Sequence, residues 1–293
     1  MKNYLLLLFL ALASIAIGQL PNTDLYMLTI KNNGQKIKLV DPIYISGFNP
    51  DGYNNQPAFN NPRELYLTTD LYDKTFTDFI KLDFMQEKYY RVTDTKGISE
   101  YSPTPKAVPR YFSAVRVEAD KTTQSLWLYP KDHSNGGKRV LSDYDNIGYH
   151  CWLTETEVAL FVLGETMDLV VANIESGKTR NILKNVGRCF RQNRDGALIF
   201  IHKVNKDVWY LKSYSPETQK TATIMATRPG SEDFELISDG TILMGEGSKI
   251  YSVNPNGGKH WTEVVNLEQY GINTITRMAT SRNRLVIVDK VGE

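Results

Sequence analysis

Charged and polar side chains stand at one equivalent position in each of six short segments of this 293-residue chain, and these side chains could do chemistry. Arg188 and Arg277 could bind a carboxylate, because a guanidinium offers paired N–H donors. Glu100 and Asp233 could hold a cation such as calcium, which prefers oxygen ligands. The residues within about one place of this position are Asn55, Gln56, Glu100, Ser102, His150, Cys151, Arg188, Cys189, Asp233, Glu235, Thr276 and Arg277.

The mixture of both charge signs leaves two interpretations of this ring open. It could bind a hydrated or charged ligand, or it could hold only water and internal salt bridges, because strand ends near an axis tolerate polar groups. If the ring binds a ligand, we predict that its binding residues are Asn55, Gln56, Glu100, Ser102, His150, Arg188, Asp233, Glu235 and Arg277.

Catalysis has weaker support in the sequence, which contains no Gly-x-Ser-x-Gly nucleophile motif. The enzymatic alternative is a hydrolase or lyase for a lactone or carbohydrate, with Ca²⁺ in the channel and Glu100, His150, Asp233 and Arg277 as working groups. Only two segments supply the carboxylates, so our primary prediction contains no catalytic residue, no metal and no cofactor. A histidine beside Trp152 is also typical of a packed residue with one satisfied ring nitrogen.

The two cysteines, Cys151 and Cys189, stand at equivalent positions of neighbouring segments. In an oxidising compartment an even count favours a disulfide. Strands that diverge from an axis oppose it, because bridged Cα atoms lie about 4.4–6.8 Å apart. The alternatives are therefore a bridge between neighbouring units and two small buried apolar side chains. Two cysteines and a dispersed histidine do not form the paired pattern of a zinc site.

The elements that position these residues are short strands separated by turn residues. The clearest unit spans residues 52–94, where turn-forming residues separate four strand-like runs. These runs are 53–60, 64–69, 77–84 and 88–94. Four strands of this size in this order predict one antiparallel sheet.

This unit recurs about every 40 to 50 residues, a period typical of propeller blades. Third-strand runs occur at 24–30, 78–84, 125–130, 168–173, 207–214 and 249–255. The N-terminal runs 24–30 and 35–41 have no first or second strand before them, and 273–280 and 284–290 have no third or fourth strand after them. Pairing these halves would close a ring and remove an exposed edge. We therefore predict an all-β, six-bladed β-propeller of four-stranded blades; a β-sandwich or two small barrels is the alternative.

Several of these segments resemble the TolB-type, WD-like propeller repeat of bacterial envelope proteins. Residues 54–59 and 100–103 match its first strand, and 193–196 and 237–240 retain part of its Ser-Pro-Asp-Gly turn. Its third-strand signal is found at 78–80, 207–209 and 249–251. The resemblance implies the fold and a place outside the cytoplasm. It implies no activity, because the fold serves many functions.

The N-terminus is typical of a secretory signal peptide: Lys2, an apolar run over residues 4–17 and small residues before Gln19. We predict cleavage after Gly18, which leaves residues 19–293 as a single propeller domain; a retained anchor is the alternative. The 34 Lys and Arg nearly balance the 33 Asp and Glu, so nothing favours nucleic acid as a partner. We expect a periplasmic or extracellular monomer without a transmembrane segment after cleavage, acting as a binding or scaffold module for an envelope protein or glycan.

Overall fold

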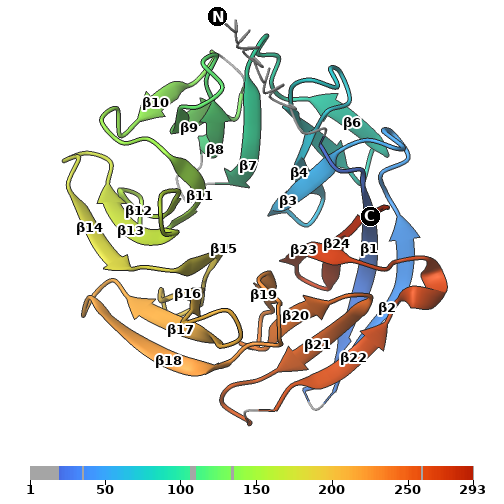
Figure 1. Cartoon of the computed structure of the whole chain (residues 1–293). Helices are drawn as coiled ribbons and strands as arrows, with labels where there is room; N and C mark the ends of the chain where they lie inside the picture. Colours follow the sequence, from blue (N-terminus) through green and yellow to red (C-terminus); the bar gives the residue numbers. More distant parts are fainter. Residues whose placement is uncertain (1–19, 35, 106–109, 133–134, 259, 293) are drawn as a thin grey trace, which may run out of the picture.

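The computed structural model of the chain describes residues 20–34, 36–105, 110–132, 135–258 and 260–292. Within these ranges 24 strands form six four-stranded antiparallel sheets, and the one helix is a short 3-10 turn, η1 (Glu268–Tyr270). The sheets surround a central axis like the blades of a propeller (Figure 1). The prediction of an all-β, six-bladed propeller is confirmed.

We number the blades in chain order. Blade 1 consists of β3 (Asn54–Asn61), β4 (Glu64–Thr69), β5 (Asp78–Asp83) and β6 (Lys88–Arg91). Blade 2 consists of β7 (Ser99–Pro105), β8 (Tyr111–Val117), β9 (Gln124–Pro130) and β10 (Lys138–Val140). Blade 3 consists of β11 (Ile147–Trp152), β12 (Glu157–Val162), β13 (Asp168–Asn173) and β14 (Thr179–Leu183).

Blade 4 consists of β15 (Val186–Gln192), β16 (Leu198–Lys203), β17 (Trp209–Ser215) and β18 (Lys220–Ala226). Blade 5 consists of β19 (Phe234–Leu236), β20 (Ile242–Glu246), β21 (Lys249–Val253) and β22 (Thr262–Asn266). Blade 6 combines the two ends of the chain, and its strands from the axis outward are β23 (Ile275–Ser281), β24 (Arg284–Lys290), β1 (Thr23–Asn32) and β2 (Ile37–Tyr44).

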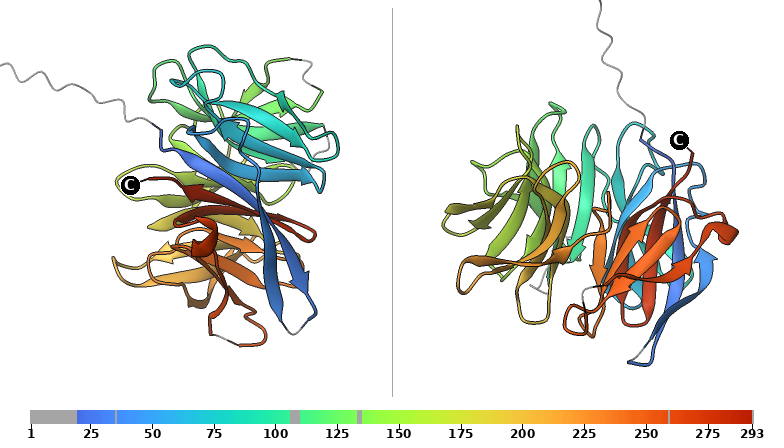
Figure 2. Two further views of the ribbon diagram at one scale, coloured as in Figure 1. Left: turned by 90° about the vertical axis from the view of Figure 1, so that its right-hand side faces the viewer. Right: turned by 60° about the horizontal axis from the view of Figure 1, so that its bottom comes forward.

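The two chain ends close the ring in blade 6. Strand β1 pairs with β24 over seven residue pairs, from Thr23 opposite Lys290 to Thr29 opposite Arg284. The Val291 N–H extends this contact by donating to the Asn22 carbonyl over 3.0 Å. Figure 2 shows the blue N-terminal strands beside the red C-terminal ones. The predicted pairing of 24–30 and 35–41 with 273–280 and 284–290 is confirmed, although residue 35 lies outside the described residues and β2 begins at Ile37.

The apolar core lies between neighbouring blades. Second strands are buried along most of their length because a blade covers each of their faces, which explains their continuous apolar runs. Between blades 3 and 4, for example, Phe161 and Val171 belong to one buried cluster with Phe190 and Phe200. Burial of such apolar side chains between blades makes a large contribution to the stability of the folded chain.

Irregular pairing distinguishes the first strands. The pairing of first with second strand shifts register in β3, β7, β11, β15 and β23. Gln56 in β3 and Ser102 in β7 have positive φ angles of 53° and 57° at these shifts. A bulge changes the direction of the side chains that follow it. The residues facing the axis therefore depart from simple alternation.

The predicted signal peptide, residues 1–18, lies outside the described residues. None of the described helical segments has the length and apolar character needed to cross a membrane.

Candidate functional site

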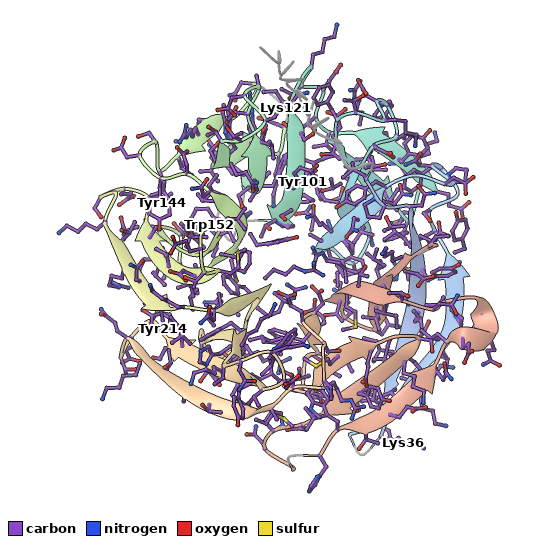
Figure 3. All side chains as sticks on the ribbon, viewed as in Figure 1. Lys36, Tyr101, Lys121, Tyr144, Trp152 and Tyr214 are labelled. Carbon is purple, nitrogen blue, oxygen red and sulfur yellow. The ribbon has the colours of Figure 1, made fainter. Side chains whose placement is uncertain are left out.

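A cavity of about 280 Å³ lies on the axis and is lined by all six first strands. Side chains reach into the central opening from the surrounding strands (Figure 3). We call this space the channel cavity. Its lining begins near the middle of the first strands, at residues such as Gln56, Arg188 and Arg277, and continues to Phe59, Gln192 and Thr280 near their ends. These lining residues show that the cavity extends toward the face of the propeller where the first strands end, and we call this face the open face.

An aspartate shared by two arginines forms the deep end of the channel cavity. Arg277 Nη1 donates to Asp233 Oδ1 over 2.7 Å, and Arg188 Nη2 donates to Asp233 Oδ2 over 2.6 Å. Arg277 Nη2 also donates to the hydroxyl of Tyr149. Burial alone would raise the pKa of Asp233, but Arg277 and Arg188 outweigh it and hold this pKa below its usual value.

A second ion pair joins three blades nearer the open face. Arg191 Nε donates to Glu235 Oε2 over 2.9 Å, while its Nη1 and Nη2 donate to the carbonyls of Phe190 and Met278, each over 3.0 Å. Every nitrogen of this guanidinium therefore has an acceptor. Arg191 is a structural tie between blades rather than an open donor.

Gln56 connects blades 1 and 2 beside the channel. Its Oε1 accepts from the backbone N–H of Ser102 over 2.8 Å and from the hydroxyl of Thr68 over 2.9 Å. Both Gln56 and Ser102 line the channel cavity, as predicted. Asn55 does not line it, because its side chain turns back to accept from the Gln56 N–H over 2.8 Å.

His150 lines the cavity, and Ser113 forms a hydrogen bond with its imidazole ring. Its Nε2 lies 2.6 Å from the hydroxyl of Ser113, which accepts from Trp152 Nε1 over 2.8 Å and lies 3.2 Å from the Thr104 carbonyl oxygen. Because Ser113 has one hydroxyl proton, it donates either to Thr104, with the imidazole proton on Nε2, or to Nε2 itself. Burial lowers the pKa of His150 to about 3, and the ring is neutral.

Glu100 lies outside the channel cavity, although the sequence placed it in the ring. It is fully buried in blade 2, where its Oε1 accepts from the Tyr129 hydroxyl over 2.7 Å and from Thr95 Oγ1 over 3.1 Å. Burial raises the pKa of this carboxyl, and nearby Asp78 adds to the effect. The bulge between Tyr101 and Thr104 separates Glu100 from the axis-facing part of β7.

The two carboxylates expected to hold Ca²⁺ are therefore not brought together. Asp233 offers both of its oxygens to arginines, and Glu100 lies elsewhere. Among the described residues, no three His, Cys, Asp or Glu side chains gather in a way that could hold a metal ion. The residues present do not fit the cation of the enzymatic alternative, and the four groups of that alternative do not form one constellation, because Glu100 lies outside the cavity.

Cys151 and Cys189 both line the channel cavity and both are free thiols. Cys189 Sγ donates to the Phe234 carbonyl over 3.2 Å. Burial raises the pKa of Cys151 to about 12 and that of Cys189 to about 11. The structure thus shows two free thiols in place of a bridge, with Cys189 buried and Cys151 half-buried.

Sequence reasoning missed Tyr149, Ser113 and Arg191. Tyr149 is the immediate neighbour of His150, and its place could have been found only by locating the register shift between Ile147 and Tyr149. Arg191 is three residues after Arg188, a spacing that puts side chains on opposite faces of a regular strand. The shift between Val186 and Phe190 brings both into the cavity lining.

Solved structures share this architecture. No protein-family model and no curated protein matches the chain. A protein assigned as TolB from Agrobacterium tumefaciens superposes with a TM-score of 0.69 at 8% identity, covering 93% of this chain and 99% of that one. TolB from Acinetobacter baumannii gives 0.59 at 11% identity, covering 94% of this chain and 66% of that one. An oligogalacturonate lyase in complex with manganese gives 0.51 at 10% identity, covering 93% and 98%.

These likenesses define a class by fold: the chain is a six-bladed β-propeller whose fold is similar to that of TolB proteins. The resemblance expected from the repeat sequences is confirmed at the level of the fold. At such low identity the activities of these structures are not transferred.

Proposed function

We propose that this chain is an extracytoplasmic binding propeller that engages a protein or glycan partner at the cell envelope through the open face of the channel cavity. One observation carries the proposal: the carboxylates of the cavity are already paired with arginines and are not available as catalytic groups or metal ligands. Asp233 is bonded to two arginines, Glu235 to Arg191 and His150 to Ser113. The remaining lining combines polar and apolar side chains on a rigid scaffold, and such a cavity suits the binding of a ligand or partner.

The test is capture of an envelope partner by immobilised protein comprising residues 19–293. Ala58→Trp would fill the cavity, because Ala58 lines it, whereas Ala222→Trp on the exposed outer strand β18 is the matched control. We expect the wild type and Ala222→Trp to capture the same partner and Ala58→Trp to lose it. Equal capture by all three folded proteins would contradict the role of the cavity.

Export is a separate part of the proposal and is supported by the sequence of residues 1–18. We expect expression of the whole chain to deliver it to the periplasm or the medium with Gln19 as its first residue. Cell fractionation and the mass of the N-terminal peptide test this. A cytoplasmic product that retains Met1 would contradict it.

A further inference from the structure

The charged groups in and beside the channel cavity carry one positive charge in excess. Lys203 pairs with Glu232 over 3.1 Å, and Arg191 pairs with Glu235 over 2.9 Å. Arg188 and Arg277 share the single carboxylate of Asp233. A charge withdrawn from water without a partner is costly, so a bound anion would be stabilised here.

Arg188 is the side chain through which an anion would bind. Arg277 uses both terminal nitrogens on Asp233 and Tyr149, and its side chain is only 13% exposed. The Arg188 side chain is 33% exposed and lines the cavity, and its Nη1 has no hydrogen-bond partner in the described part of the chain. The sequence predicted a clamp of two arginines; the structure leaves one of them open.

The walls above Arg188 indicate what surrounds the anionic group. Pro57, Ala58 and Phe59 of β3 and Met278 and Ala279 of the neighbouring β23 line the cavity together. A uronic acid carries hydroxyls next to its carboxylate, and this apolar stretch of the wall has no side-chain hydrogen-bonding group for them. One open guanidinium suits a planar monoanion better than a phosphate dianion. A carboxylate beside an apolar side chain fits, and this is the chemistry of a peptide C-terminus.

A second, larger cavity continues from the first. It measures about 710 Å³, lies between the ends of blades 4 and 5, and shares Gln192 and Thr280 with the channel cavity. Ile224, Leu236 and Ile242 supply apolar lining. Gln192 Nε2 donates to the carbonyls of Leu153 and Gly196, which leaves its carbonyl oxygen to accept a backbone N–H. The continuity favours an extended chain over a compact ligand.

We propose that the channel cavity receives the C-terminal residue of a protein partner, with Arg188 Nη1 donating to the terminal carboxylate and the preceding residues lying in the second cavity. This inference rests on the proposed binding function and specifies the group that is recognised. The charge excess, the open donor, the apolar walls and the adjoining groove all support it.

The experiment uses N-acetylated hexapeptides ending in Ala, Val or Leu, each made with a free C-terminal carboxylate and as the carboxamide. Binding to the immobilised mature chain is measured. We expect at least one carboxylate peptide to bind about tenfold or more tightly than its amide, since a charge-assisted hydrogen bond is gained. Arg188→Gln should abolish this preference and Arg188→Lys should retain part of it. Arg228→Gln is the matched control, because Arg228 also pairs with a carboxylate, is 29% exposed and lies outside the cavity.

Equal binding of acids and amides, or a preference that survives Arg188→Gln, would overturn the inference. So would Arg188-dependent binding of D-galacturonate over D-galactose without any peptide binding, which would assign the site to an acidic glycan. Envelope capture that is unaffected by Arg188→Gln would overturn the carboxylate site and leave the binding function standing. Peptide discrimination without any envelope partner would leave the site and overturn the envelope role.

Discussion

Arg277 and Asp233 form an ion pair within the propeller channel, with Nη1 and Oδ1 2.7 Å apart and each side chain only 13% exposed. Arg188 bonds to the other oxygen of the same carboxylate. Side chains from three consecutive blades thus meet at one carboxylate: Arg188 of β15, Asp233 just before β19 and Arg277 of β23. Its removal would leave two arginines without a counter-charge in the channel.

Asp233→Asn is therefore expected to destabilise the protein by about 3–5 kcal/mol, the usual cost of breaking a buried pair from one side. Urea denaturation at pH 7 measures the free energy of unfolding. Glu263→Gln is the control, because Glu263 forms an exposed pair with Lys249 and its loss should cost less than about 1 kcal/mol. Equal costs for the two substitutions would show that the channel cluster is not structural.

The low pKa of Asp233 also predicts where acid acts on this cluster. A carboxyl with a lower pKa in the folded state stabilises the fold above its unfolded pKa of about 4. That stabilisation is lost as the pH falls through the folded value. The Asp233 contribution therefore fails only below about pH 4, whereas another group acts at higher pH.

His150 is that group. Its pKa is about 3 in the fold and about 6.5 when unfolded, so between these values the unfolded chain binds more protons. We expect stability to fall as the pH drops from 6.5 toward 4, and His150→Gln to flatten this decline. Denaturation at pH 7 and pH 4.5 measures it, with His202→Gln, at a less buried histidine, as the control. An unchanged decline in His150→Gln would contradict the buried neutral ring.

Glu100 predicts the opposite dependence. Its pKa is raised, so the folded state holds the proton more tightly and stability is lost as the pH rises from about 4.3 through the folded value. Each pKa unit of difference corresponds to about 1.4 kcal/mol. Glu100→Gln should remove this loss when unfolding is compared at pH 4.5 and pH 8.

Glu64 offers the contrasting control for that experiment. Burial would raise its pKa, but Asn60, Lys81 and Asn61 together lower it, and Lys81 lies 3.0 Å away. Glu64→Gln should therefore cost stability at pH 8, where Glu100→Gln should not. The same response to both substitutions would contradict the assignment of Glu100.

The sequence was sufficient for the order of the strands but not for the direction of single side chains. Residues 64–69 and 284–290 coincide with β4 and β24, because their apolar runs have no other place than between two blades. The axis-facing residues were harder, since a register shift reverses which face a side chain occupies. Arg188 and Arg277, which the sequence placed near the axis, line the cavity, whereas Glu100 does not.

Contacts between distant segments set a second limit. Ser113 orients His150 from 37 residues away, and Asp233 reaches Arg188 and Arg277 across gaps of 45 and 44 residues. Residue types and local spacing indicate that such partners exist near the axis. Which ones meet depends on the rotation between blades, which no local pattern contains.

The two cysteines provide the last prediction. Both thiols have pKa values raised by burial, to about 12 for Cys151 and about 11 for Cys189, and the thiolate is the reactive form. Iodoacetamide at pH 8 should therefore leave the folded protein unmodified and add two carbamidomethyl groups in denaturant without reductant, as read by intact mass. No addition in denaturant until reductant is present would reveal a disulfide and contradict the free pair. Cys189→Ser should lower the count in denaturant to one and locate the remaining group on Cys151.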